Sequence, residues 1–103
     1  MTWRQLVNAL ERYVPADSVT TYAEVSLWGY GVPNMDQPVR SLLRGARDHD
    51  YQRLTNRVVK ADGELADLLE APDQQRRRLL IEGVPLTADS RMDFDQTSPI
   101  ELA

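Results

Sequence analysis

The segment TTYAEVSLWGYGVPNMDQPVRSLLRGAR, residues 20–47, decides the fold because it has the pattern of two short helices separated by a glycine-bearing turn. Thr20 or Thr21 is a suitable N-cap for the first helix, which we expect to run to about Trp28. Gly29 and Gly31 are expected to end it, and Pro33 follows them.

The second helix is expected to begin at Asn34 or Asp36 and to run to about Ala46. Its apolar side chains recur at helical spacing and are expected to face the core: Val39, Leu42, Leu43 and Ala46. Its other face carries three arginines: Arg40, Arg44 and Arg47. Two short helices with a basic second member are typical of a helix-turn-helix, although such an arginine row is more often a solvated face than a DNA contact.

The flanking segments extend this pattern. Residues 2–13 have the spacing of an amphipathic helix. Residues 54–65 have the pattern of a strand, a turn at Ala61-Asp62-Gly63 and a short returning segment, which predicts a hairpin. A further helix is expected from about residue 72 to 83, followed by an extended stretch at 91–96. The predicted fold is mostly α with a small β-hairpin, a single winged helix-turn-helix domain at residues 1–95 with a flexible tail at 96–103.

Composition narrows the classes of function. The chain has no cysteine and one histidine, so thiol chemistry, disulfides and the usual metal sites are not expected, and neither is a cofactor. The net charge is −4, but residues 36–60 hold six basic side chains and three acidic ones. The overall sign therefore says little about a local binding face. Without a signal peptide pattern or a long apolar run, the expected location is the cytoplasm, and the nucleoid if the protein binds DNA.

Four segments in order resemble one known family: VPADSVTTYAEV at 14–25, the basic helix, NRVVKADGEL at 56–65 and QQRRRLLIEGV at 74–84. They resemble the DNA-binding domain of the O6-alkylguanine-DNA alkyltransferases. The resemblance is stronger to the alkyltransferase-like proteins, the non-catalytic relatives that consist of this domain alone. It covers about residues 3–95, and it implies a DNA-binding protein connected with repair.

The resemblance places a degenerate reactive pocket at Thr55, Asn56 and Arg57. The family's reactive centre is Pro-Cys-His-Arg-Val, and the matching stretch here begins at Leu54. Thr55 stands at the acceptor cysteine and Asn56 at the histidine base. A threonine hydroxyl is a much weaker acid than a thiol, and an asparagine cannot accept the proton. The only histidine, His49, precedes Thr55 without the spacing of a triad. Alkyl transfer and enzymatic activity are therefore not expected.

The resemblance also implies a DNA-contacting set, drawn from the start of the first helix of the pair and the exposed face of the second: Thr21, Tyr22, Gln37, Arg40, Ser41, Arg44 and Arg47. The family's arginine finger falls on Asp36 or Gln37, and neither is arginine. The family's pocket loop falls on Ala66-Asp67-Leu68-Leu69, which is bulkier and carries a carboxylate. Because base flipping costs a few kcal/mol, the loss of these groups argues against efficient flipping.

Two functional interpretations remain open from the sequence. In the first, a monomeric non-enzymatic protein binds double-stranded DNA, with or without alkylation, senses O6-alkylguanine-type damage and engages nucleotide excision repair proteins. In the second, the winged helix is a diverged protein-interaction module without lesion recognition, in which the acidic tail and aromatic residues such as Trp28 and Tyr30 contact a partner. No membrane partner is expected in either.

Overall fold

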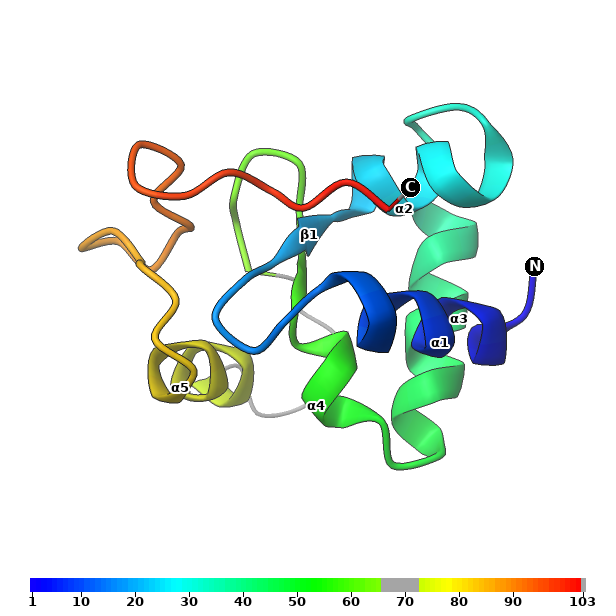
Figure 1. Ribbon diagram of the computed structural model, residues 1–103, viewed down its shortest axis with the longest axis horizontal. Helices are drawn as coiled ribbons and strands as arrows, with labels where there is room; N and C mark the ends of the chain where they lie inside the picture. Colours follow the sequence, from blue (N-terminus) through cyan, green and yellow to red (C-terminus); the bar gives the residue numbers. More distant parts are fainter. Residues whose placement is uncertain (66–72, 103) are drawn as a thin grey trace.

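The computed structural model describes residues 1–65 and 73–102. Its elements in chain order are α1 (Trp3–Tyr13), β1 (Thr20–Thr21), α2 (Tyr22–Tyr30), α3 (Asp36–Asp48), α4 (Gln52–Thr55), β2 (Val58–Val59) and α5 (Asp73–Ile81). Helices α1, α2 and α3 lie together, and α5 lies apart from them at the opposite end of the molecule (Figure 1). The predicted fold class, mostly helical with a small sheet, is confirmed, and the arrangement is consistent with a small winged-helix-like domain.

Helix α1 begins where the sequence predicts. The Thr2 hydroxyl accepts a hydrogen bond from the Gln5 amide, and the Gln5 side chain accepts one from the Thr2 amide, which forms a reciprocal capping box. Its apolar stripe packs on α3. Gly45 in α3 permits this approach, because a Cβ there would lie 3.1 Å from the Trp3 ring. The indole of Trp3 also stacks on His49, with ring centroids 4.3 Å apart.

Helix α2 is fixed at both ends by residues that the sequence singles out. The Thr21 hydroxyl accepts a hydrogen bond from the Glu24 amide at 3.1 Å, which caps the first turn. Gly31 ends the helix with φ of 77°, a left-handed conformation that favours glycine. Gly29, which was also expected to end the helix, lies inside it instead, because only Gly31 has the left-handed conformation. The following helix, α3, begins at Asp36 without a side-chain cap and buries Val39 and its stripe against α1 and α2.

The sheet differs from the expected hairpin. Its two strands pair in parallel, with Thr20 opposite Val58 and Thr21 opposite Val59. The reason is topological: α2, α3 and α4 form a helical crossover between the strands, and such a connection returns the chain in the same direction. Leu54, expected in a strand, lies in α4 instead. The turn at 61–63 is present, because the Lys60 amide donates to the Glu64 carbonyl oxygen at 2.9 Å.

A second, smaller core lies beside the sheet. It consists of buried apolar residues from β2, α5 and the segments around them: Val19, Val59, Leu79, Val84 and Met92. Two isolated antiparallel bridges join residues around it, Glu64 with Arg91 and Leu86 with Met92. The expected apolar side of α5 is only partly correct. Leu80 and Ile81 follow Leu79 in sequence but point elsewhere on the helix, and their exposed fractions are 47% and 76%.

The C-terminal segment, expected to be a flexible tail from residue 96, contacts the core in the structure. The Ile100 amide donates to the Val19 carbonyl oxygen at 2.8 Å, and the Thr20 hydroxyl donates to the Ile100 carbonyl oxygen at 2.7 Å. Leu102 is buried in the main core. Residues 99–102 therefore lie along β1 in the structure. The mobility of the tail in solution stays a prediction.

Candidate nucleic-acid interface

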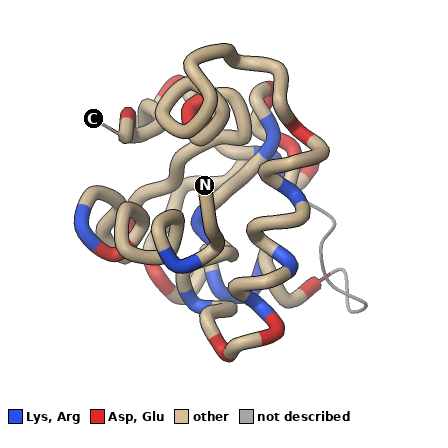
Figure 2. The backbone as a smooth tube through the Cα atoms, turned by 90° about the vertical axis from the view of Figure 1, so that its right-hand side faces the viewer, with Lys and Arg blue, Asp and Glu red and all other residues tan. Residues whose placement is uncertain are grey.

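The exposed face of α3 is the main feature of this surface. Gln37, Ser41 and Arg44 are exposed, and they recur at the three- and four-residue spacing that places side chains on one face of a helix. The buried stripe of Val39, Leu43 and Ala46 lies on the opposite side. Arg40 and Arg47 are half-buried and lie at one flank of the exposed face. In Figure 2, blue segments recur along this helix. The structure therefore places the predicted α3 residues on one side of the helix.

Arg44 differs from most other arginines of the chain. Within the described residues it forms no salt bridge or hydrogen bond, and it is exposed. By contrast, Arg53 pairs with Glu11 at 2.9 Å, and Arg91 lies within 4 Å of three carboxylates. Since the Arg44 guanidinium is solvated, it can meet a phosphate without first breaking an ion pair.

The two ends of α3 carry acidic side chains, which bound this basic face. Asp36 occupies the first turn, where a carboxylate is favoured by the helix dipole, and Asp48 occupies the last residue. Both are exposed. A polyanion approaching α3 would therefore be attracted at the centre of the helix and repelled near its ends.

A cavity of about 520 Å³ opens beside the N-terminal half of α3. It is lined by residues from α2, α3 and the turn after β2: Tyr22, Asp36, Gln37, Arg40, Lys60, Ala61 and Asp62. Two cations, two carboxylates and one phenol thus share one hollow. Lys60 and Asp62 were not predicted as site residues, although the Asp-Gly turn in the sequence located the segment that carries them. A phosphate in this cavity would be attracted by Arg40 and by Lys60, which also lies 3.9 Å from Glu64, and repelled by the carboxylates of Asp36 and Asp62.

Thr21 and Tyr22, which were predicted to contact DNA, have little exposed surface for such a contact. Both are buried, and the Thr21 hydroxyl is already occupied as the cap of α2. Burial raises the pKa of the Tyr22 phenol above its usual value, with the nearby guanidinium of Arg40 opposing that shift. The Tyr22 ring therefore belongs to the core and also lines the cavity beside Arg40.

The three residues predicted to form a degenerate pocket are buried, and each of them has an internal hydrogen-bond partner. Thr55 is 2% exposed, and its hydroxyl donates to the Gln52 carbonyl oxygen at 3.2 Å, within α4. The carbonyl of Asn56 accepts from the Gln75 amide at 3.0 Å. Gln75 was not predicted, and a buried polar residue on a polar helix leaves no sequence signal. The pocket loop at residues 66–69 lies outside the described residues.

Arg57 forms a buried ion pair. Its Nε and Nη2 donate to the two carboxylate oxygens of Glu82 at 3.2 and 3.1 Å, and its Nη1 donates to the Val14 carbonyl oxygen at 3.0 Å. Both charged side chains are 5% exposed. Arg57 therefore joins β2 to the segment after α5 and to the end of α1, and in this arrangement its role is structural.

The described residues also limit other classes of site. No group of three or more His, Cys, Asp or Glu side chains among them is placed to hold a metal ion. Within the same residues, no helix has the length and apolar character needed to cross a membrane.

The comparisons with known proteins bear on the fold. No family model and no curated protein sequence matches the chain. Among solved structures, the fold is similar to the crystal structure of S. pombe Atl1 in complex with damaged DNA containing O6-carboxymethylguanine. The TM-score is 0.62 and the identity 19%, over 93% of this chain and 95% of that chain. At this identity the likeness concerns architecture, so the chain shares, over nearly its whole length, the fold of an alkyltransferase-like protein.

Proposed function

We propose that this protein binds double-stranded DNA without catalysing a reaction on it, and that α3 provides the contact. The observation that carries the proposal is the exposed face of α3, which presents Arg44 with Arg40 and Arg47 at its flank. An α-helix fits a groove of duplex DNA, and arginines on its outer face can contact the phosphates on either side. The neighbour Atl1, with the same fold, is described in complex with damaged DNA, which supports this use of the fold.

The cavity at Tyr22 would take a backbone phosphate next to the groove. Arg40 and Lys60 supply cationic donors there, and Gln37 adds an amide at the same edge. Most such contacts are independent of sequence, so we expect affinity to depend on salt more than on base composition. We propose a monomer as the binding unit.

Alkyl transfer to the protein is not part of this proposal. Thr55 is buried and its hydroxyl already donates within α4, and the adjacent Asn56 has no group that takes up a proton. A threonine in this setting lacks both the acidity and the base that a nucleophile needs. Mass spectrometry of the protein after incubation with O6-methylguanine DNA should show the unmodified mass, whereas a stoichiometric adduct on Thr55 would overturn the non-enzymatic assignment.

Lesion sensing and the engagement of nucleotide excision repair proteins are finer proposals that follow from the family resemblance. Asp36 and Gln37 stand where an arginine would stabilise the gap left by a flipped base. The Asp36 carboxylate would repel the neighbouring DNA phosphates instead of stabilising the gap. We therefore expect at most a few-fold preference for a duplex that contains O6-methylguanine. A larger preference would mean that lesion recognition persists with Asp36 at this position.

Fluorescence anisotropy with a labelled duplex tests the central proposal. Arg44→Ala should weaken binding by several-fold irrespective of DNA sequence, because it removes one phosphate contact. Arg77→Ala is the matched control: it removes the same charge from an exposed position on α5, at the opposite end of the molecule from α3 (Figure 1). Equal binding by wild type and Arg44→Ala, or no binding of either at low salt, would refute the proposed interface.

A protein-interaction module is the second candidate function. The observation that favours it is a cavity between α1 and α2, with Trp28 in its wall, on elements that the DNA proposal does not use for groove contact. Absence of DNA binding at low ionic strength, with a specific response at this cavity, would favour the interaction module as the sole function.

A further inference from the structure

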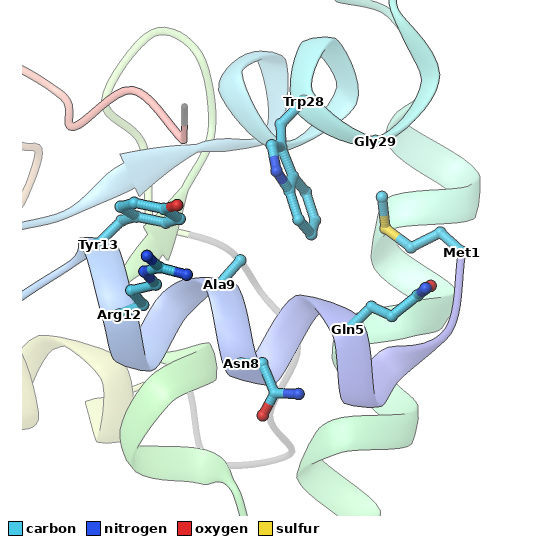
Figure 3. Close-up of a pocket in the computed structure, with 8 residues that line it drawn as sticks. All are labelled: Met1, Gln5, Asn8, Ala9, Arg12, Tyr13, Trp28 and Gly29. Carbon is cyan, nitrogen blue, oxygen red and sulfur yellow. The ribbon is translucent and has the colours of Figure 1, made fainter.

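A hollow of about 600 Å³ lies between α1 and the C-terminal half of α2. Trp28 projects from α2 towards α1, with Tyr13 and Arg12 to one side of it and Met1 and Gln5 to the other (Figure 3). Its volume falls within the range of about 300–1,000 Å³ that is usual for ligand pockets. The groups on its walls are both aromatic and polar, which is the composition expected of a recognition site rather than of a packing defect.

The hollow exists because small residues stand where larger ones would fill it. Ala9 lies in it on α1 and Gly29 on α2. A Cβ on Gly29 would come within 1.8 Å of the Met1 side chain, so Met1 fills the space beside Gly29 and the open part of the hollow lies over Ala9. Between the rings of Trp28 and Tyr13 this leaves room for a large apolar or aromatic side chain of a partner, which would pack on the indole face.

The charge of the lining is positive. Arg12 is the one charged side chain among the lining residues, and the described part of the chain gives it no salt bridge. Its guanidinium lies 5.4 Å from the centroid of the Tyr13 ring, a cation–π contact that holds it at the end of the hollow. The neighbouring carboxylate of Glu11 is engaged elsewhere, with Arg53 at 2.9 Å. A partner carboxylate can therefore meet Arg12 without a competing acidic side chain in the lining.

We infer that this hollow is a docking site for an acidic peptide segment of a partner protein, with one aromatic or large apolar anchor side chain next to a carboxylate. The anchor packs against Trp28 and Tyr13, and the carboxylate pairs with Arg12. The lining comes from Met1, α1 and α2 and not from α3, so the inference does not depend on DNA binding.

The test is an NMR titration of the full-length, 15N-labelled protein with the probe acetyl-Asp-Glu-Phe-Asp-Glu-amide. Amide shifts should concentrate at the lining residues, together with the indole N–H of Trp28. Arg12→Glu should weaken binding at least tenfold. The matched control is Arg4→Glu, an exposed arginine on the same helix that lies over Trp3 and outside the lining, and it should change affinity less than twofold. The probe with lysine in place of each acidic residue should not bind.

Each alternative result has a defined meaning. The inference is overturned if no lining residue shifts at millimolar probe, if the lysine analogue binds equally well, or if the shifts map to α3. Repeating the titration with saturating duplex DNA distinguishes a failure of the docking site from a failure of the proposed DNA binding. Probe binding that persists when DNA binding is absent supports the docking site alone, and loss of probe binding in a DNA-competent protein overturns it.

Discussion

Replacement of Glu82 by leucine tests the internal support of the fold. Glu82 accepts two hydrogen bonds from Arg57, and its carboxylate lies 3.3 Å from Arg78 Nε. Arg57 and Glu82 are each 5% exposed, so water does not compensate for the loss of either partner. Leucine at position 82 would leave the Arg57 guanidinium buried with only the Val14 carbonyl oxygen as its acceptor.

The expected cost is large for a chain of this size. Breaking a buried pair by removing one partner typically destabilises by about 3–5 kcal/mol, because a charge remains buried without compensation. Small domains have total stabilities of about 5–15 kcal/mol. At about 4–8 °C per kcal/mol for a domain of this length, the melting temperature should fall by at least about 12 °C.

Urea unfolding followed by tryptophan fluorescence and far-UV circular dichroism would measure this cost. Arg57→Met should cost less than Glu82→Leu, because Glu82 would keep Arg78 within ion-pair distance. The double variant should recover most of the loss, since neither charge remains buried, and it should bind DNA as the wild type does. A loss below about 1 kcal/mol for Glu82→Leu would refute the view that this pair is buried and structurally essential.

Three further predictions concern single positions. Thr21→Ala removes the hydroxyl that accepts from the Glu24 amide, and urea unfolding should show a loss of about 1 kcal/mol. Gly45→Val should cost about 1–3 kcal/mol by calorimetry, because its Cβ would lie 3.1 Å from the Trp3 ring, whereas an unaffected melting temperature would mean that Trp3 moves freely. Burial raises the pKa of the Tyr22 phenol in the folded state, so the folded protein favours the neutral phenol. The stability that depends on the neutral phenol is fully present below about pH 10 and is lost as the pH rises above that value. Tyr22→Phe should therefore lose less stability than wild type between pH 9 and 11, and parallel curves would contradict the burial of the phenol.

Much of the fold follows from local signals in the sequence. The caps at Thr2 and Thr21, the stop at Gly31 and the buried stripe of α3 all lie where periodicity and capping rules put them. The pairing of the strands was not predictable in this way. Two residues per strand carry too little pattern to identify a partner, and the parallel partner of Val58 is separated from it by three helices.

The candidate interface was predictable in part. Helical spacing is enough to place Arg40, Arg44 and Arg47 on one side of α3. It does not show that Arg57, for which the sequence left a structural role and a binding role equally open, is directed inward to Glu82. That pairing joins residues far apart in the chain, so only the tertiary structure brings it about.

The salt dependence of duplex binding tests the central claim most directly. Each phosphate contact contributes about 0.9 to the slope of log affinity against log salt. Three or four cations on and beside α3 therefore predict a slope of about −3, and Arg44→Ala should make it shallower by about 0.9. Binding that does not change with salt, or an Arg44→Ala variant with the slope of the wild type, would contradict the account.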